Sequence, residues 1–560
     1  MMRHQQLLDQ ATEACATREH FSPFPERPGR DDDSLAAIEA GRRAYEERLG
    51  DTVELEQPTD GWLEAHEVSP YTRQALGIRY PTAGVDDLFG AAGRAGERWR
   101  AVPPQRRVDL CLEIVHRWFD RWFEIAHANQ HTTGQSFSMS CIGSGTNALD
   151  RGIEAVVHAA AAMDRVPHGG RWEKDFGRTR VRLDKRFHIL PRGVAVVVTC
   201  ASFPTWNAYP ALLANLATGN PAVVKPHPTS VLTMALAVQT AQQVLREEGL
   251  PPEIVQLAPD TPETPVTKDL IAHPACAIVD FTGSASFGSW IEANAHPAIA
   301  FTETSGVNTV VLESAEDLDA ALAAVATSLS LFTAQMCTSV QNVYVPATGV
   351  RTPEGTIDLD EVVGRLTREV DAIAEHPRRA AGVMGAVQSP ATVADVERLE
   401  QQAAGRGEIA RATGPYAHPE YPDATTATPS IAVVDPSARA LFGEERFGPS
   451  AFVVVAEDAD DALGQAVTDV ARAGTIASHL YSTDPAYADR ATEAYLRAGA
   501  SLTRNLTGPM PLNFSAAYSD YHVTGLSPAG NACLTDEAFI AGRFRIAQVR
   551  EPAAGKEEHA

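Results

Sequence analysis

A single cysteine, Cys337, stands in a context in which a thiol could act as a nucleophile. It lies in residues 331–339 (LFTAQMCTS), which close an Ala-rich apolar run, and a strand-like segment follows at residues 342–345. At a turn between a helix and a strand, a thiol can be partly exposed and close to backbone N–H groups, which suits nucleophilic attack. A lone cysteine is more often a buried group that packs as a small hydrophobic side chain, so the hypothesis depends on the rest of the chain.

A carboxylate that could serve this thiol stands upstream. Glu303 follows the apolar and hydroxyl-bearing residues 299–302 and precedes Cys337 by 34 residues. A carboxylate in such a setting could act as a general base toward water. A surface carboxylate is the alternative, and the apolar neighbours argue against it.

Two further features suit the phosphates of a nucleotide. Lys225 ends an apolar strand-like run at residues 221–224, where a flexible ammonium could reach a ribose or phosphate oxygen. Gly283 and Ser284 form a turn between a strand and a helix, so that helix N–H groups could face a pyrophosphate. A solvated lysine and ordinary helix capping by Ser284 are the alternatives for these positions.

These residues must be positioned by a parallel sheet. Strands that are apolar on both faces alternate with helices through the middle of the chain, and this pattern is typical of a parallel sheet covered by helices. Such a sheet binds ligands at the carboxyl ends of its strands. The predicted strands are 193–199, 221–224, 254–257 and 277–281, and the predicted helices are 231–248 and 284–295.

Further elements are predicted on both sides of this region. Upstream we expect helices over 85–99, 106–128 and 146–163, and an alternating ribbon over 178–190. Downstream we expect strands at 309–312, 343–346 and 452–455 and helices at 318–332 and 458–473. Residues 143–148 (GSGTNA) match a loose dinucleotide fingerprint, but no strand precedes them, so we do not expect a site there.

The predicted fold class is α/β, with two α/β domains and a β-ribbon. The bounds are 1–80 for an N-terminal arm, 81–177 and 200–303 for a Rossmann-type dinucleotide-binding domain, 304–500 for a catalytic domain, 178–199 and 501–550 for an oligomerisation ribbon with the C-terminal segment, and 551–560 for a disordered tail.

Composition restricts the partners and the compartment. The 47 Lys and Arg residues against 72 Asp and Glu residues give a net charge of −25, which disfavours nucleic acid and anionic membrane surfaces. The seven cysteines are scattered and form no C-x-x-C pair, so we expect neither a disulfide framework nor a metal site. The first twenty residues are polar, and no apolar run reaches transmembrane length. We therefore expect a cytoplasmic protein.

Five stretches together carry a resemblance to a known family. They are 217–226 (ATGNPAVVKP), 281–284 (FTGS) with Gly288, 303–306 (ETSG), 335–337 (QMC) and 444–449 (EERFGP). In this order, and with the 34-residue separation of Glu303 and Cys337, they resemble the aldehyde dehydrogenase superfamily over roughly residues 80–530. Each motif is weak alone, and the five in order are a strong signal.

The resemblance implies a role for each residue. Glu445 would orient the nicotinamide ribose and Phe447 would pack near the nicotinamide, although a charged turn with a core Phe is the alternative reading. The residues implied along the rest of the dinucleotide, NADP or NAD, are Lys225, Pro226, Gly283, Ser284 and Gly288.

The resemblance also implies a reaction. Cys337 would attack an aldehyde to give a thiohemiacetal, hydride would pass to the nicotinamide, and Glu303 would activate water to hydrolyse the resulting thioester. A base at the Glu303 position is typically absent in the CoA-acylating branch, so its presence favours hydrolysis to the carboxylic acid.

Three departures from the family pattern are visible. Ser202 stands where the family has the Asn whose amide stabilises the oxyanion, while Asn207 is close but out of register. Pro228 replaces a carboxylate that would bind the adenosine ribose, which slightly favours NADP over NAD. Ser305 and Val307 alter the family's Glu-Leu-Gly-Gly-Lys.

The ends of the chain resemble one branch, the aldehyde dehydrogenases of phenylacetate degradation, which are associated with the semialdehyde formed on opening of the oxepin-CoA ring. The segments that carry this likeness are 21–26, 513–522, 525–532 and 539–545. The implied substrate is a CoA-linked semialdehyde, and the implied assembly is a homodimer or homotetramer. The alternatives are another bulky aldehyde, a redox-silent cysteine hydrolase, or a non-catalytic scaffold.

Overall fold

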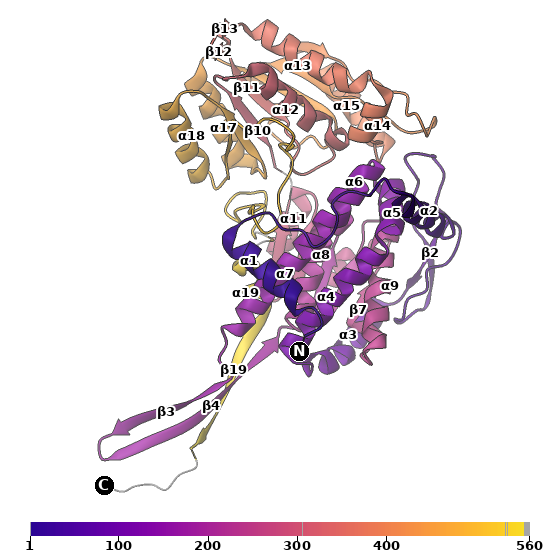
Figure 1. Ribbon diagram of the computed structural model, residues 1–560, viewed down its shortest axis with the longest axis vertical. Helices are drawn as coiled ribbons and strands as arrows, with labels where there is room; N and C mark the ends of the chain where they lie inside the picture. Colours follow the sequence, from indigo (N-terminus) through magenta and orange to yellow (C-terminus); the bar gives the residue numbers. More distant parts are fainter. Residues whose placement is uncertain (1, 305, 533, 535, 554–560) are drawn as a thin grey trace.

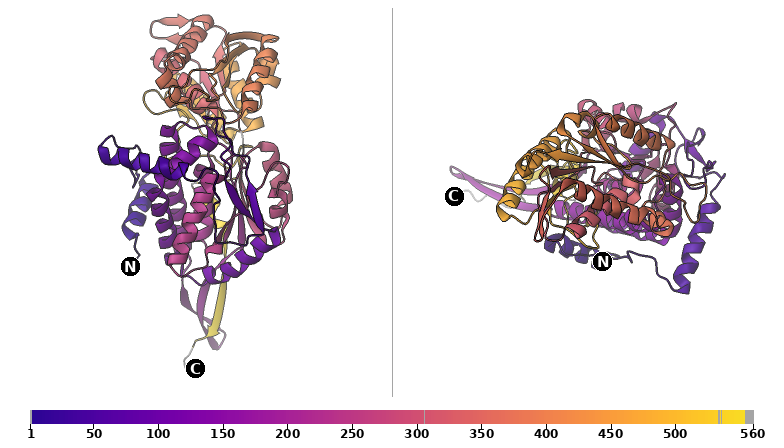
Figure 2. Two further views of the ribbon diagram at one scale, coloured as in Figure 1. Left: turned by 90° about the vertical axis from the view of Figure 1, so that its right-hand side faces the viewer. Right: turned by 90° about the horizontal axis from the view of Figure 1, so that it is seen from above.

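Two α/β units and a projecting β-ribbon make up the chain (Figure 1). The structure is a computed structural model, and it describes residues 2–304, 306–532, 534 and 536–553. The units lie end to end, and the ribbon extends from the first unit away from the second (Figure 2). Ser305 and residues 554–560, most of the tail predicted to be disordered, lie outside the described residues.

The first unit is built on a parallel sheet of five strands in the order β7-β6-β5-β8-β9. Every residue of β5 and β6 is buried, which confirms the prediction of a sheet covered on both faces. The sequence prediction missed β9. The strands are β5 (Val194–Val198), β6 (Ala222–Lys225), β7 (Val255–Leu257), β8 (Cys276–Thr282) and β9 (Ile299–Glu303).

Helices α4, α7, α8 and α9 cover one face of this sheet, and α3, α10 and α11 cover the other. The predicted helix over 106–128 is divided at Arg121, whose φ of −103° and ψ of 17° leave the helical region. Residues 142–146 form the π-helical turn η1 (Ile142–Thr146) that leads into α7. The helices are α3 (Val85–Arg100), α4 (Pro104–Asp120), α5 (Trp122–Thr133), α6 (Phe137–Cys141), α7 (Asn147–Asp164), α8 (Pro204–Ala217), α9 (Val231–Glu247), α10 (Thr267–Ala272) and α11 (Ala285–Asn294).

The second unit is built on a seven-stranded sheet in the order β14-β15-β16-β11-β10-β17-β18. Its strands are parallel except for β14, which pairs antiparallel with β15 at one edge. The strands are β10 (Thr309–Leu312), β11 (Asn342–Pro346), β14 (Gly407–Arg411), β15 (Ser430–Val434), β16 (Ser450–Ala456), β17 (Ser478–Tyr481) and β18 (Thr503–Arg504).

Helices pack on this second sheet, and Asp458 caps α17 by accepting from the N–H of Asp461. A short hairpin, β12 (Val350–Thr352) and β13 (Gly355–Ile357), lies at its margin. The helices are α12 (Leu318–Ser330), α13 (Leu359–Ala374), α14 (Pro377–Val383), α15 (Pro390–Ala404), α16 (Arg439–Phe442), α17 (Ala459–Ala473) and α18 (Pro485–Arg497), with the 3₁₀ turn η3 (Leu331–Ala334) after α12.

The ribbon has three antiparallel strands, β3 (Gly169–Phe176), β4 (Thr179–Pro191) and β19 (Phe544–Pro552), in the order β19-β4-β3. It therefore begins before residue 178, and residues 194–198, assigned to it from the sequence, belong instead to the centre of the first sheet because both of their faces are buried. Residues 551–552 are part of β19, not of a disordered tail.

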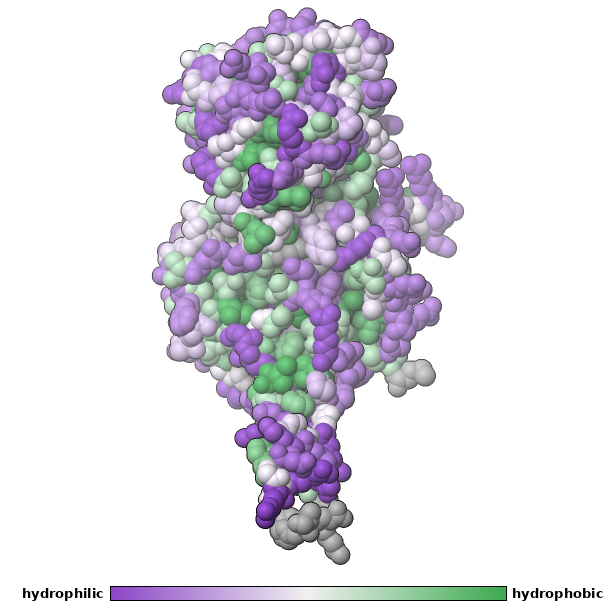
Figure 3. All heavy atoms as spheres, turned by 90° about the vertical axis from the view of Figure 1, so that its left-hand side faces the viewer, coloured by the Kyte–Doolittle hydropathy of each residue, from purple (hydrophilic) through white to green (hydrophobic). Residues whose placement is uncertain are grey.

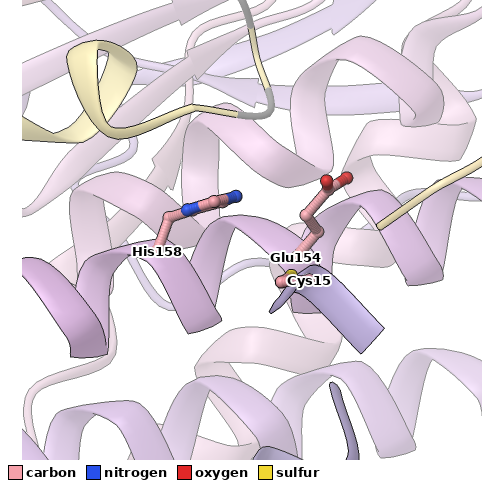
Figure 4. Close-up of side chains that lie close together, drawn as sticks. All are labelled: Cys15, Glu154 and His158. Atoms are coloured by element: carbon pink, nitrogen blue, oxygen red, sulfur yellow. The ribbon is translucent and has the colours of Figure 1, made fainter. Parts of the chain in front are cut away.

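The N-terminal arm contains two helices, α1 (Gln5–Thr17) and α2 (Asp32–Glu46), and a hairpin of β1 (Gly61–Glu64) and β2 (Arg79–Thr82). Cys15 of α1 lies close to Glu154 and His158 of α7 (Figure 4). Glu154 is paired with Arg151 at 2.7 Å, and burial together with the Glu154 charge raises the pKa of Cys15 to about 12. We interpret this cluster as a polar contact that fixes α1 on α7.

The C-terminal segment returns between the two units before it enters the ribbon (Figure 1). Residues 529–531 run antiparallel to the end of β9, where the N–H of Thr304 donates to Ala529 O and the N–H of Asn531 donates to Thr302 O. Because of this pairing, residues 513–530 pass beside the loop that precedes β11. In the described part of the chain, no helix is long and apolar enough to cross a membrane.

Candidate active site

The loop before Cys337 is held in an uncommon backbone conformation. Phe332, Thr333 and Ala334 have φ values of 49°, 52° and 51°, in the left-handed region that residues with a Cβ rarely adopt. The helix predicted over 318–332 accordingly ends two residues early. Such a run persists only where the surrounding structure holds it in place.

Side-chain hydrogen bonds from neighbouring residues hold this loop. Thr333 Oγ1 donates to Met384 O at 2.8 Å. The Gln335 amide donates to Ala386 O at 3.1 Å and accepts from the Gln388 N–H at 3.0 Å. The loop is therefore tied to the segment between α14 and α15.

Asn308 ties the other side of the loop to the second sheet. Its amide nitrogen donates to Cys337 O at 2.7 Å and to Ser339 O at 2.8 Å. Its amide oxygen accepts from residues 475–477, through one hydroxyl and two backbone N–H groups at 2.9–3.1 Å. One buried amide thus fixes the backbone on both sides of the cysteine.

Glu303, at the end of β9, comes close to Cys337 with His522 between them. Nε2 of His522 lies 4.0 Å from Cys337 Sγ and 3.4 Å from Glu303 Oε1. Asn207 Nδ2 donates to the same Glu303 oxygen at 2.9 Å. The side chains of Glu303 and His522 are each 2% exposed. The nucleophile and the base expected from the sequence are therefore brought together.

Ser202 and Asn207 make different contacts beside Cys337. Ser202 lines the cavity beside Cys337, and its backbone carbonyl accepts from Gln135 Nε2 at 2.7 Å. Asn207, in the first turn of α8, is the residue whose amide reaches Glu303. Counting from the downstream motif missed this because the first turn of α8 carries Asn207 back toward the site.

The electrostatic surroundings favour the neutral thiol in the ligand-free protein. Burial raises the pKa of Cys337 well above its ordinary value, and the neighbouring Glu303, Cys200 and Glu445 raise it further. Burial also raises the pKa of Cys200 to about 11. Ionisation of Cys337 therefore needs a nearby acceptor for its proton and a donor for the thiolate.

A cavity of about 470 Å³ opens on one side of Cys337, at the carboxyl ends of β5, β6 and β8. Gly283 and Ser284 place the N-terminus of α11 in its wall, where Ser284 caps the helix by accepting from the Phe287 N–H at 3.4 Å. The position of this cavity at the carboxyl ends of the strands, the ammonium group of Lys225 and the N-terminus of α11 fit a dinucleotide. The predicted residues that line it are Ser202, Lys225, Gly283, Ser284, Glu303, Cys337, Glu445 and Phe447.

Lys225 is not the freely solvated ammonium that its place at a strand end suggested. Its Nζ pairs with Asp260 Oδ1 at 2.6 Å, and its side chain is 6% exposed. Burial lowers the pKa of Lys225, against the opposing effect of Asp260. Burial and the Lys225 charge lower the pKa of His227, in the same wall, to about 4. The cationic group in the cavity is thus held in place by a carboxylate.

Pro226 and Gly288 do not line this cavity. Pro226 is buried, and its carbonyl accepts from Lys225 Nζ at 2.9 Å. Gly288 permits close packing, since a Cβ there would lie 2.3 Å from Thr304 Cγ2. Pro226 and Gly288 therefore contribute to the site through the path of the backbone and through close packing.

A second cavity, of about 530 Å³, opens on the other side of Cys337. Asn207, Cys337 and His522 lie in its wall, which the N-terminal arm and the C-terminal segment complete. The thiol is therefore shared between two cavities, one of which fits a dinucleotide and the other an organic substrate.

Three residues that shape the site were missed by sequence reasoning. His522 lies 185 residues beyond Cys337 in an aromatic-rich tail, and no local pattern marks it. Asp260 follows β7, and its position after the carboxyl end of a predicted strand could have indicated a place in the site. Asn308 lies directly after the altered family motif and could have been noted from that position.

The chain is similar to known proteins. The family model described as aldehyde dehydrogenase family matches residues 62–505. The chain is 39% identical to the crystal structure of NAD-dependent aldehyde dehydrogenase from Burkholderia multivorans, with a TM-score of 0.95 over 99% of this chain and 100% of that one.

Two curated relatives are more distant. 1-Pyrroline-5-carboxylate dehydrogenase 1 of Halalkalibacterium halodurans is 24% identical over 465 residues, which cover 76% of this chain and 82% of that protein. Lactaldehyde dehydrogenase of Escherichia coli is 26% identical over 430 residues, which cover 73% of this chain and 80% of that protein.

Replacement of Asn308 tests how the cysteine loop is held. Asn308→Ala leaves two carbonyls and two N–H groups without partners, so we expect the free energy of unfolding to fall by about 2–3 kcal/mol. We also expect faster hydrogen exchange at the Ile476 and Ala477 amides, measured by mass spectrometry.

Asn215→Ala is the matched control, because Asn215 is an equally buried amide that contacts Asp280 and Arg543 instead. It should lower stability without changing exchange at residues 476–477. Equal exchange at these amides in both variants would show that Asn308 does not hold the loop.

Proposed function

The chain belongs to the aldehyde dehydrogenase family, and we propose that it oxidises an aldehyde to a carboxylic acid through covalent chemistry at Cys337, with NADP or NAD as the oxidant. The observation that carries this proposal is the position of Cys337 between two cavities, with Glu303 beside it. A redox-silent hydrolase or a scaffold would need neither the dinucleotide-shaped cavity nor its buried Lys225.

The first half of the reaction uses the thiol and the amide beside it. Sγ of Cys337 attacks the aldehyde carbon that enters from the second cavity, and negative charge develops on the former carbonyl oxygen. Asn207 is the amide best placed to donate to that oxygen, since it lines both cavities. The cofactor supplies the hydride acceptor in the first cavity, where Lys225 and the α11 N-terminus would hold its ribose and phosphates.

The second half uses Glu303 as the base toward water. Its Oε1 is held by Asn207, whereas Oε2 is buried and has no hydrogen-bond partner among the residues that the structure describes. Oε2 is therefore the oxygen that can accept a proton from water as it attacks the thioester on Cys337. The products are the carboxylic acid and the regenerated thiol.

The second cavity supports a bulky aldehyde as the substrate. Its wall includes Met139, Ile142 and Phe514, whereas Glu26 and Arg27 of the N-terminal arm add charged groups. A wall of this kind suits a large acyl chain with a polar distal part. We propose a CoA-linked semialdehyde of phenylacetate degradation as the first candidate, with other bulky aldehydes as the alternative.

The absence of a carboxylate at Pro228 supports use of NADP. A carboxylate there would bind the adenosine ribose hydroxyls and repel a 2′-phosphate. Lys225 adds positive charge nearby, although Asp260 offsets part of it. The similar Burkholderia multivorans protein is described as NAD-dependent, so we propose that both cofactors are accepted, with a slight preference for NADP.

The ribbon supports a homodimer or homotetramer. Its strands expose Phe176, Leu190, Ile546 and Val549, each at least 39% accessible in the single chain. On the face shown in Figure 3, hydrophobic residues gather where the ribbon joins the first unit, while its outer part is mostly hydrophilic. Pairing of the ribbon with a second copy would cover the exposed apolar side chains.

Glu303→Gln separates the two halves of the reaction. We expect a burst of reduced cofactor close to one equivalent per active site, followed by steady-state turnover lowered by about 10²–10⁴-fold, because the hydrolysis of the thioester lacks its base and limits turnover. Stopped-flow absorbance of the reduced cofactor measures both phases.

Cys337→Ala should give no burst, and Glu316→Gln, an exposed carboxylate, should behave as wild type. A Glu303→Gln protein with full steady-state turnover would contradict the assigned role.

Cofactor choice can be tested at Pro228. We expect kcat/KM for NADP to be equal to or greater than that for NAD in wild type, measured on a panel that includes CoA-linked semialdehydes. Pro228→Glu should shift the ratio toward NAD by about tenfold, because it restores a carboxylate that repels a 2′-phosphate. Pro228→Gln, of similar size without charge, should leave the ratio near that of wild type. A tenfold preference for NAD in wild type would contradict the assignment.

A further inference from the structure

A histidine from the C-terminal segment, His522, lies beside Cys337 and Glu303. The side chain of His522 is 2% exposed, and its Nε2 faces both Cys337 Sγ and Glu303 Oε1. Its ring packs against the Trp206 ring with the centroids 4.4 Å apart. The pairing of residues 529–531 with the end of β9 brings this segment to the site. The imidazole is therefore positioned by the same strand that carries Glu303.

The hydrogen bonds available to the ring indicate where its proton lies. Nδ1 of His522 is buried and has no hydrogen-bond partner among the described residues. A proton on Nδ1 would lose its hydrogen bond to water without replacement, whereas a proton on Nε2 has Glu303 Oε1 at 3.4 Å. The neutral imidazole therefore keeps its proton on Nε2, directed at Glu303 and Cys337.

The other groups around the sulfur oppose its ionisation. Glu303 faces it from β9, Cys200 from the turn after β5, and Glu445 from the loop before β16, and all three disfavour the thiolate. One N–H of Asn207 Nδ2 is engaged with Glu303, and the other is assigned above to the oxyanion. The thiolate therefore requires a hydrogen-bond donor directed at Sγ, and Nε2 of His522 lies 4.0 Å from this sulfur.

We propose that His522 is a further catalytic residue, whose Nε2–H lies close to Glu303 while Cys337 is a thiol and donates to Sγ once the thiolate forms. The S–H bond breaks, the proton bonds to Glu303 Oε2, and the Nε2–H hydrogen bond to the sulfur strengthens as the thiolate forms. Glu303 then releases this proton to water in the cavity before it serves the hydrolysis. The role rests on Cys337 being the nucleophile proposed above.

Alkylation of Cys337 tests this without aldehyde or cofactor. The amide nitrogen of Gln stands near the Nε2 position of His, whereas that of Asn stands near Nδ1, so His522→Gln keeps the donor and His522→Asn removes it. We expect the iodoacetamide rate at pH 7, followed on the Cys337 peptide by mass spectrometry, to fall about tenfold in His522→Asn, with a rise of about one unit in the apparent pKa of the thiol. His522→Gln should stay within about threefold of wild type.

The comparison excludes a merely structural role, because both variants lose the ring contact with Trp206. His66→Gln, which alters an exposed histidine, is the control for the substitution itself, and thermal unfolding checks that each variant is folded. Equal rates in wild type and His522→Asn would overturn the proposal. Equal losses of alkylation rate in both variants would also overturn the proposal, because they would indicate that His522 acts as a proton acceptor or through packing. Because no turnover is needed, these outcomes are independent of whether the substrate assignment is correct.

Discussion

The amide of Asn308 is the constraint on which the position of the nucleophile depends. The three left-handed residues before Cys337 cost on the order of 1–2 kcal/mol each relative to ordinary backbone, so the loop would relax without its anchors. The side-chain amide of Asn308 makes five hydrogen bonds, two to the backbone around the cysteine and three to residues 475–477. Buried amides that are fully bonded in this way specify one arrangement. The sulfur is therefore presented between the cavities by the second unit, not by the first.

The active site exists only where three parts of the chain meet. The first sheet supplies Glu303 and the dinucleotide cavity, the second unit supplies Cys337, and the C-terminal segment supplies His522. The pairing of residues 529–531 with β9 joins the segment to the first sheet. Arg543 strengthens the same joint, through a buried ion pair with Asp280 of β8 at 2.6 Å. The proposed access of the aldehyde from one cavity and of the cofactor from the other depends on this meeting.

Sequence reasoning found the parts of the molecule that are marked locally. Strands apolar on both faces indicated the first sheet, and the order of motifs identified Cys337 and Glu303. Sequence reasoning failed where contacts between segments far apart in the sequence determine the position of a side chain. The ion pair of Lys225 with Asp260 joins the ends of neighbouring strands, and His522 is placed by pairing with β9. The contact of Asn207 with Glu303 was also missed, because register was counted along the chain, whereas the first turn of α8 decides which side chain reaches Glu303.

The central claim is that Cys337 carries the substrate as a thioester. Rapid acid quenching of the enzyme with aldehyde and oxidised cofactor, followed by digestion and mass spectrometry, tests it most directly. The account predicts that the peptide containing Cys337 gains the mass of the aldehyde less two hydrogens, at up to one group per active site. Product formation with Cys337 unmodified at every quench time, or with the acyl group on Cys200, would contradict it.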